Sequence, residues 1–179
     1  ISVILMERII NFQIYRKKDT KLDKKGEIME IERKFLVAEI PENLDRYPHN
    51  EIEQAYISTS PTIRIRKSDS DYILTVKSKG AVAREEFELS ITEEQYKNLS
   101  EKVETRFVSK TRYIIPIDGG LNAELDIYHL YLDGLLTVEV EFTDMAECMS
   151  FVSPKWFGKD ISDDKRYKNT ALSLFGKPE

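Results

Sequence analysis

Residues 30–35 read Glu-Ile-Glu-Arg-Lys-Phe, and this stretch decides the expected fold. Alternate side chains of a β-strand project to the same face, so Glu30, Glu32 and Lys34 share one face and the intervening residues share the other. A single segment of this kind is also typical of an ordinary strand with one solvated face. The pattern becomes informative because it is repeated along the chain.

Charged residues recur at alternate positions in several later segments, with mostly apolar side chains between them. These sets are Arg64 and Arg66; Lys77 and Lys79; Arg84, Glu86 and Glu88; Lys110 and Arg112; Glu124 and Asp126; and Glu139 and Glu141. Carboxylates and cations are present on this face in similar numbers. The chain is therefore expected to form a sheet with one charged face and one apolar face.

The sequence predicts a mainly β (α+β) protein in which short turns separate the strands. The expected strands are 29–38, 51–58, 62–68, 71–78, 84–91, 106–116, 121–129 and 135–142. Such a series of about eight strands favours an antiparallel barrel or a strongly curved sheet.

A few helices are expected between and after the strands. The capping box Thr92-Glu93-Glu94-Gln95 predicts one helix, Asp144 begins a second, and a third runs from Ser162 or Asp163 to about Phe175. If the helices pack outside the barrel, the charged face turns inward and lines a tunnel. In the alternative arrangement, the charged face is solvated and the apolar face forms an ordinary core.

An inward charged face needs partners, because desolvated charges are costly. A polyanion with a bound metal would supply them, since Arg and Lys hold phosphate oxygens and Glu pairs hold a hard divalent cation.

The composition disfavours several classes of protein. The net charge of −5 would repel a nucleic-acid backbone. Cys148 is the only cysteine, which excludes an internal disulfide and favours the cytoplasm. The two histidines disfavour a histidine-rich zinc site. Because no apolar run approaches about 20 residues, no membrane span is predicted.

Residues 1–28 differ in character from the remainder, and include a basic polar stretch at 16–25. Residues 24–28 resemble a translated ribosome-binding sequence before Met29. We therefore expect 1–28 to be a non-native or disordered extension and 29–179 to be the domain. A tether for nucleic acid or membrane is the alternative for the basic stretch.

The ordered series of motifs resembles the CYTH superfamily, also called triphosphate tunnel metalloenzymes, from Met29 to about Leu174. The matching segments are Glu30-x-Glu32-x-Lys34, Gln54-Ala55-Tyr56, Arg64-x-Arg66, Lys77, Arg84-x-Glu86-Phe87-Glu88, Lys110-x-Arg112, Asp126, Glu139-Val140-Glu141-Phe142, Pro154-x-Trp156-Phe157-Gly158 and Tyr167-Lys168-Asn169.

The resemblance implies an eight-stranded antiparallel closed β-barrel with helices packed outside. Its charged tunnel would act on triphosphates with Mg²⁺ or Mn²⁺. The implied metal ligands are Glu30, Glu32, Asp126, Glu139 and Glu141. The implied phosphate-binding residues are Lys34, Arg64, Arg66, Lys77, Arg84, Lys110 and Arg112. Lys34, Glu86 and Glu88 are the candidate catalytic residues, and either glutamate could activate the attacking water.

Hydrolysis of inorganic tripolyphosphate to pyrophosphate and phosphate is the expected reaction. The alternatives are a class IV adenylate cyclase, a thiamine or nucleoside triphosphatase, and a non-catalytic polyphosphate-binding module. The cyclases resemble one another in a His-Phe pair before the first motif, where this chain has Gly26-Glu27-Ile28. The expected partner is a small-molecule triphosphate, with no nucleic acid and no membrane, and a homodimer is a further expectation.

Overall fold

A computed structural model describes residues 31–77 and 86–179 of the chain. Within them, one antiparallel sheet runs in the order β5-β4-β3-β2-β6-β7-β8-β1-β9. Its strands are β1 (Ile31–Val37), β2 (His49–Thr59), β3 (Thr62–Ser68), β4 (Asp71–Lys77), β5 (Glu86–Ser90), β6 (Val108–Pro116), β7 (Asn122–Tyr128), β8 (Leu136–Phe142) and β9 (Phe157–Asp160). The first eight lie where the alternation predicts them.

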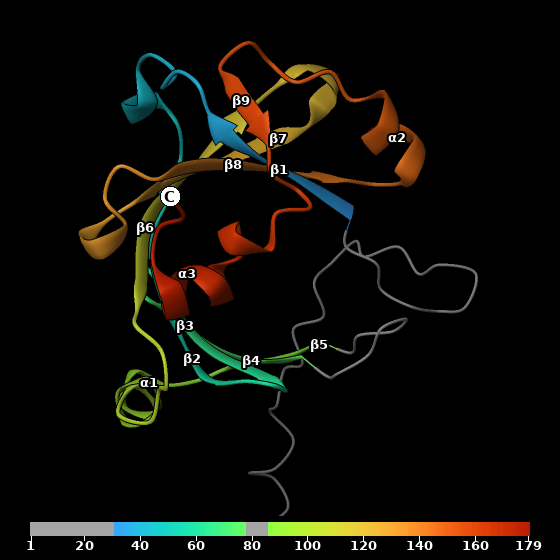
Figure 1. Cartoon of the computed structure of the whole chain (residues 1–179). Coiled ribbons are helices and arrows are strands. Elements are labelled where there is room, and N and C mark those ends of the chain that lie inside the picture. The colour runs from blue at the N-terminus through green and yellow to red at the C-terminus, as the bar shows by residue number, and fades with distance from the viewer. Residues whose placement is uncertain (1–30, 78–85) are drawn as a thin grey trace, which may run out of the picture.

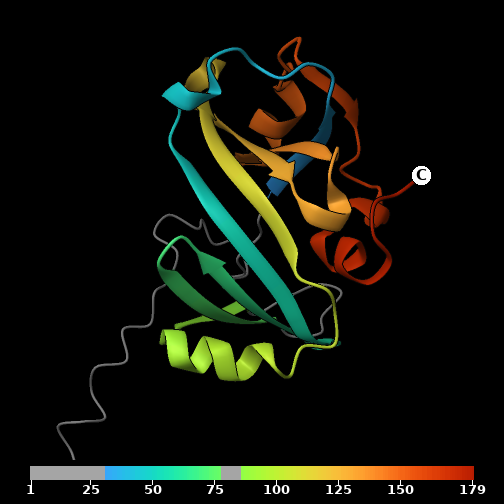
Figure 2. The ribbon, with the colours of Figure 1, turned by 90° about the vertical axis from the view of Figure 1, so that its left-hand side faces the viewer.

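The sheet curves strongly, as Figure 1 shows, and we call its concave side the hollow. Strands β8, β1 and β9 form one wall, β3, β4 and β5 form the opposite wall, and β2 and β6 join them. Figure 2 shows β2 and β6 as long strands that cross the molecule diagonally between the two walls. The charged positions of the sheet face the hollow, on the same side as Tyr128, which packs against Leu172 of the C-terminal helix.

The expected closed eight-stranded barrel is wrong for the described residues. The sheet has nine strands, and its hydrogen-bonded order ends at β5 on one side and β9 on the other. Strand β1 pairs with β8 along one edge and with β9 at Phe35 and Val37 on the other, and the described residues show no pairing of β1 with β5. The result is an antiparallel sheet that is curved but open.

Strand β9 was missed because it is short and lies between a proline-containing segment and a turn. Gly158 allows the close approach of this strand to β1. A Cβ atom at Gly158 would lie 3.1 Å from the backbone oxygen of Leu36. Phe157 is buried and joins Phe35 and Val138 in the main apolar cluster.

The helices differ in which face of the sheet they cover. Helix α1 (Glu93–Ser100) has the predicted capping box at Thr92 and contacts β3 and β4. Helix α2 (Met145–Ser150) is capped by Asp144 and contacts β1 and β8. Both lie on the outer, apolar face, as expected.

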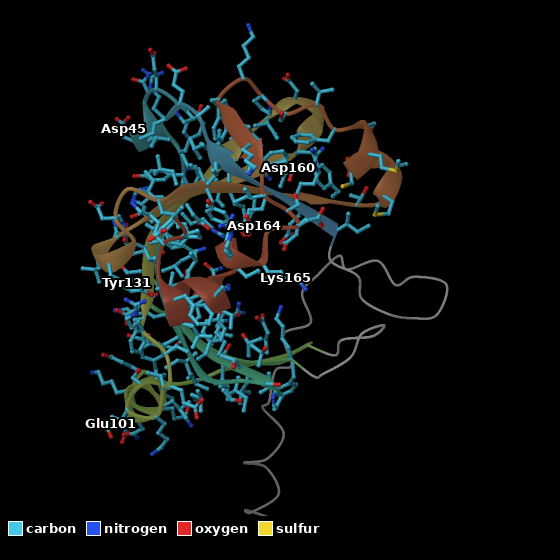
Figure 3. The ribbon with its side chains drawn as sticks, viewed as in Figure 1. Asp45, Glu101, Tyr131, Asp160, Asp164 and Lys165 are labelled. Carbon is cyan, nitrogen blue, oxygen red and sulfur yellow. The ribbon has the colours of Figure 1, made fainter. Side chains whose placement is uncertain are left out.

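The C-terminal helix departs from the expectation that all helices pack outside. Helix α3 (Asn169–Phe175) lies on the hollow side of the sheet against β2 and β6 (Figure 1). Its Leu172 is buried with Val108 and Tyr128. The segment expected to start this helix instead forms a short 3₁₀ turn, η4 (Lys165–Tyr167), capped by Asp164. Figure 3 shows Asp164 and Lys165 on this inner side.

Three further 3₁₀ turns complete the described structure: η1 (Leu44–Arg46), η2 (Asp118–Gly120) and η3 (Leu130–Leu132). Among the residues that the structure describes, no helix is both long and apolar enough to cross a membrane. The expected extension, residues 1–28, lies outside the described ranges, and its nature stays a prediction.

Candidate active site

Strand register brings the charged residues together on the hollow side. Glu32 lies opposite Glu141, and Lys34 lies opposite Glu139, across the pairing of β1 with β8. Glu124 on β7 is also opposite Glu139. Directly opposed side chains in an antiparallel pair have Cβ atoms about 4.5–5.5 Å apart, so these groups interact.

Lys34 is buried, and its Nζ lies 2.9 Å from Glu139 Oε1. Burial alone would lower the pKa of Lys34, but Tyr128, Glu139 and Asp126 outweigh it and raise the pKa above its ordinary value. Burial alone would raise the pKa of Glu139, but Lys34, Arg112 and Lys110 hold it well below its usual range. Both groups are therefore charged at neutral pH.

A second cluster of ion pairs lies on β6 and β7. Asp126 accepts hydrogen bonds from Lys110 Nζ at 2.5 Å and from Arg112 Nε and Nη2 at 2.6 Å each. Arg112 also donates to Glu139, 2.7 Å away, and to Glu124. Arg112 thus links this cluster to the Lys34–Glu139 pair.

Lys110 is the most enclosed cation of the described face. Burial, followed by the positive charge of Arg112, lowers the pKa of Lys110 to about 8, although Asp126 and Glu139 oppose the shift. The side chain of Lys110 is almost fully buried, and that of Asp126 is completely buried. Neither residue can exchange its partner for water without local movement.

The opposite wall of the hollow is more cationic. Arg64 Nη2 donates to Thr75 at 2.9 Å and to Glu88 at 3.3 Å. The Nε atom of Arg66 is buried and has no hydrogen-bond partner in the described part of the chain. Burial, then Arg64 and Arg112, lower the pKa of Arg66 to about 10. An anion would relieve this repulsion.

Gln54 and Tyr56 extend this wall onto β2. Gln54 is fully buried, and its Nε2 donates to Tyr56 Oη at 3.1 Å. Its Oε1 has no hydrogen-bond partner among the described residues. Because Gln54 lies opposite Arg66 in the register, the unpaired polar atoms gather on neighbouring strands. Buried polar atoms of folded proteins are nearly always paired, so such a cluster indicates a ligand or water site.

The donor set for a metal consists of carboxylates on β1, β7 and β8. Glu32 and Glu141 are exposed to the hollow, whereas Glu124 and Glu139 are partly buried. Oxygen ligands of this type suit a hard divalent cation such as Mg²⁺ or Mn²⁺. Within the described ranges, no three acidic, histidine or cysteine side chains already converge closely enough to hold an ion. The oxygen donors therefore suit a metal ion. In this structure Glu139 is paired with Lys34 and Arg112.

Several predicted residues cannot be placed in this geometry. Glu30 and Arg84 lie outside the described residues, as does the side chain of Glu86. Lys77 lies at the end of β4, opposite Thr62 in the register. Glu124 was recognised in the alternating pattern but was not named as a candidate ligand. Glu124 lies beside Glu139 because β7 pairs with β8, and the sequence alone does not reveal which strands are neighbours.

Comparisons with known proteins agree with this geometry. The CYTH domain family matches residues 29–146. An inorganic triphosphatase of Nitrosomonas europaea is 41% identical over 149 residues, covering 81% of this chain and 97% of that protein. An inorganic triphosphatase of Acetivibrio thermocellus is 27% identical over 146 residues, covering 80% and 92%. A crystal structure of an inorganic triphosphatase, 37% identical, superposes with a TM-score of 0.68 and covers 83% of this chain and 97% of that chain.

Proposed function

Because this chain belongs to the CYTH domain family, we propose that it is an inorganic triphosphatase that hydrolyses tripolyphosphate to pyrophosphate and phosphate. The two relatives described above carry that name, and the first of them is matched over nearly its whole length. Their shared activity supports hydrolysis over cyclisation of a nucleotide. The proposed substrate is a small anion, with no nucleic acid or membrane involved.

The observation that carries the proposal is a pair of buried polar atoms on neighbouring strands on the concave side of the sheet. Arg66 Nε and Gln54 Oε1 are buried, and neither has a hydrogen-bond partner among the described residues. A guanidinium is planar, always charged and suited to bind phosphate oxygens through more than one hydrogen bond. Arg64, Arg66 and Lys77 on strands β3 and β4 would hold the non-bridging oxygens of a triphosphate together with Lys34 on β1 and with Lys110 and Arg112 on β6.

Electrostatic stabilisation is the main catalytic contribution of this chain. A triphosphate repels an attacking water through its own charge, and fixed cations neutralise that charge as it moves to the leaving oxygen. Lys34 on β1 is held by Glu139 on β8, so its ammonium is oriented before the substrate binds. Arg112 is held similarly by Asp126.

The proposed metal ligands are Glu32, Glu139 and Glu141, with Glu30 at the unplaced start of the motif. A bound Mg²⁺ or Mn²⁺ would supply charge neutralisation and would polarise the phosphate oxygens. Glu124 is added to this set because it lies opposite Glu139 and its side chain is 27% exposed.

Glu88 is the described candidate for proton acceptance from water. Its Oε1 accepts from Arg64 Nη2 at 3.3 Å and Thr75 Oγ1 at 3.1 Å, which orients the carboxylate beside the cationic wall. Its side chain is 33% exposed, so water can reach it. Glu86, its neighbour on β5, remains the alternative base.

Phosphate release from tripolyphosphate tests the proposal, with Mg²⁺, Mn²⁺ or EDTA in parallel reactions. ATP is run alongside, with detection of both phosphate and cyclic AMP. We expect release from tripolyphosphate that depends on the metal and is lost in EDTA. Cyclic AMP formation would instead assign a cyclase. Binding of tripolyphosphate without release of phosphate would leave only a binding module.

A homodimer and a cytoplasmic location remain predictions. Size-exclusion chromatography with light scattering tests the first, and fractionation of cells tests the second.

A further inference from the structure

Asp126 is the most enclosed carboxylate on the described charged face. Its side chain is 0% exposed, whereas those of Glu139 and Glu124 are 14% and 27% exposed. Its Oδ2 accepts from Lys110 Nζ and Arg112 Nη2, and its Oδ1 accepts from Arg112 Nε. Both carboxylate oxygens therefore face cations of the protein itself.

Arg112 is bound differently by Asp126, the inner carboxylate, than by Glu139 and Glu124, the two outer carboxylates. Nε and Nη2 form a two-pronged contact with Asp126, which fixes the plane of the guanidinium. Glu139 and Glu124 each make one contact with the same group, through Nη2 and Nη1. The inner contact is thus the geometrically stricter one, and the outer contacts can be exchanged by rotation of partly exposed side chains.

We propose that Asp126 is a positioning residue that holds Lys110 and Arg112 in place for the triphosphate, and that it does not bind the metal. This inference rests on the proposed function, because it assigns a role within the same site. It replaces the metal-binding role that the family resemblance implies for Asp126.

Electrostatics supports a positioning role for Asp126 and a metal-binding role for the outer glutamates. A divalent cation at Asp126 would displace charge-assisted hydrogen bonds and would lie directly beside an ammonium and a guanidinium. The outer glutamates can instead turn toward a metal in the hollow. The N–H groups of Arg112 that they release then face the phosphate oxygens, while Asp126 keeps the guanidinium in position.

The test compares Asp126→Asn with the wild-type chain and with Asp160→Asn as a matched control. Asp160 accepts from Arg33 through Oδ2 and from Ser162 through Oδ1, and neither of these partners is a proposed ligand of the metal or the phosphates. Three quantities are measured: KM for tripolyphosphate at saturating Mn²⁺, kcat, and the Mn²⁺ affinity of the free protein by electron paramagnetic resonance. The last readout does not depend on catalysis.

We expect Asp126→Asn to raise KM by about 10-fold or more, because the two cations lose their fixed orientation. Mn²⁺ affinity should stay within about twofold, and Asp160→Asn should match the wild type in all three quantities. A fall of about 10-fold or more in Mn²⁺ affinity would overturn the inference whatever the value of KM. An unchanged KM would overturn it as well.

A double variant covers the case in which Asp126→Asn does not fold. Lys110→Met combined with Asp126→Asn removes one buried cation together with the anion, and it is compared with Lys110→Met alone. The added substitution should raise KM further through Arg112, without changing Mn²⁺ affinity. A lower Mn²⁺ affinity in the double variant, or an equal KM, would contradict the positioning role.

Measurements on the wild-type protein distinguish failure of the proposed function from failure of the positioning role of Asp126. If it neither binds nor hydrolyses tripolyphosphate, the proposed function is wrong and this inference is wrong with it. If the wild type hydrolyses tripolyphosphate and the variant has the same KM, only the positioning role is rejected.

Discussion

Replacing Arg66 with Gln is expected to move stability and ligand affinity in opposite directions. The buried Nε of Arg66 has no hydrogen-bond partner in the described part of the chain, and Arg64 and Arg112 add positive charge around it. This arrangement is unfavourable without an anion and favourable with one. Substitution of Arg66 therefore distinguishes its effect on the free energy of unfolding from its effect on ligand affinity.

The expected magnitudes follow from these surroundings. Hydrogen bonds to charged groups contribute about 1.5–3 kcal/mol each, so Arg66→Gln should weaken tripolyphosphate binding about 10- to 150-fold. Removal of an uncompensated charge should leave the free energy of unfolding unchanged or raise it by up to about 2 kcal/mol. Because ligand stabilisation depends on the ratio of concentration to Kd, the rise in Tm that tripolyphosphate causes should shrink.

Isothermal titration calorimetry gives Kd, and urea denaturation gives the free energy of unfolding without ligand. Arg33→Gln is the matched control, since it makes the same change on the outer face, where Arg33 donates to Asp160. This control should leave Kd unchanged. The reasoning is refuted if Arg66→Gln leaves Kd within about twofold of the wild type, or if it unfolds the protein more readily by over about 1 kcal/mol.

Three further predictions concern the carboxylates and the ninth strand. Glu141→Gln should abolish metal-dependent phosphate release while circular dichroism and Tm stay unchanged; full activity would contradict its role as a ligand. The lowered pKa of Glu139 contributes stability that is complete above its ordinary pKa of 4.5 and is lost as the pH falls from there toward the lowered value. Glu139→Gln in EDTA should therefore flatten the acid side of the pH–stability profile, measured by urea denaturation between about pH 6 and pH 3; an unchanged slope would show that other groups govern it. Gly158→Ala should destabilise the fold by about 1–3 kcal/mol, because the new methyl group meets the Leu36 backbone oxygen at 3.1 Å; unchanged stability would mean that β9 can shift without cost.

The candidate site could be predicted to the level of residue type and face. Lys34, Arg64, Arg66, Lys110 and Arg112 all project into the same hollow, as the alternation indicates. The role of each charge was harder to predict. Asp126 and Glu139 are both acidic residues at alternating positions, yet one is fully enclosed by cations and the other is partly exposed. Burial of this kind depends on neighbouring strands and has no local signature.

The closed barrel was a wrong expectation for a related reason. Strand positions follow from short-range periodicity, whereas closure depends on which strand occupies the outer edge of β1. At Phe35 and Val37 that edge pairs with β9, a short segment that carries no strong alternation of its own. The hollow-side position of α3 likewise depends on the contact of Leu172 with Val108 and Tyr128, which are distant from it in the sequence.

Local sequence pattern was enough to predict the first eight strands, the capping box at Thr92 and the segregation of charge onto one face. These features are encoded locally, since side chains two residues apart share a face of any β-strand. The pairing of each carboxylate with its cation, the two open ends of the described sheet and the unsatisfied Nε of Arg66 became known only from the three-dimensional fold. Those outcomes depend on packing and desolvation between segments far apart in the chain, and both are properties of the assembled sheet.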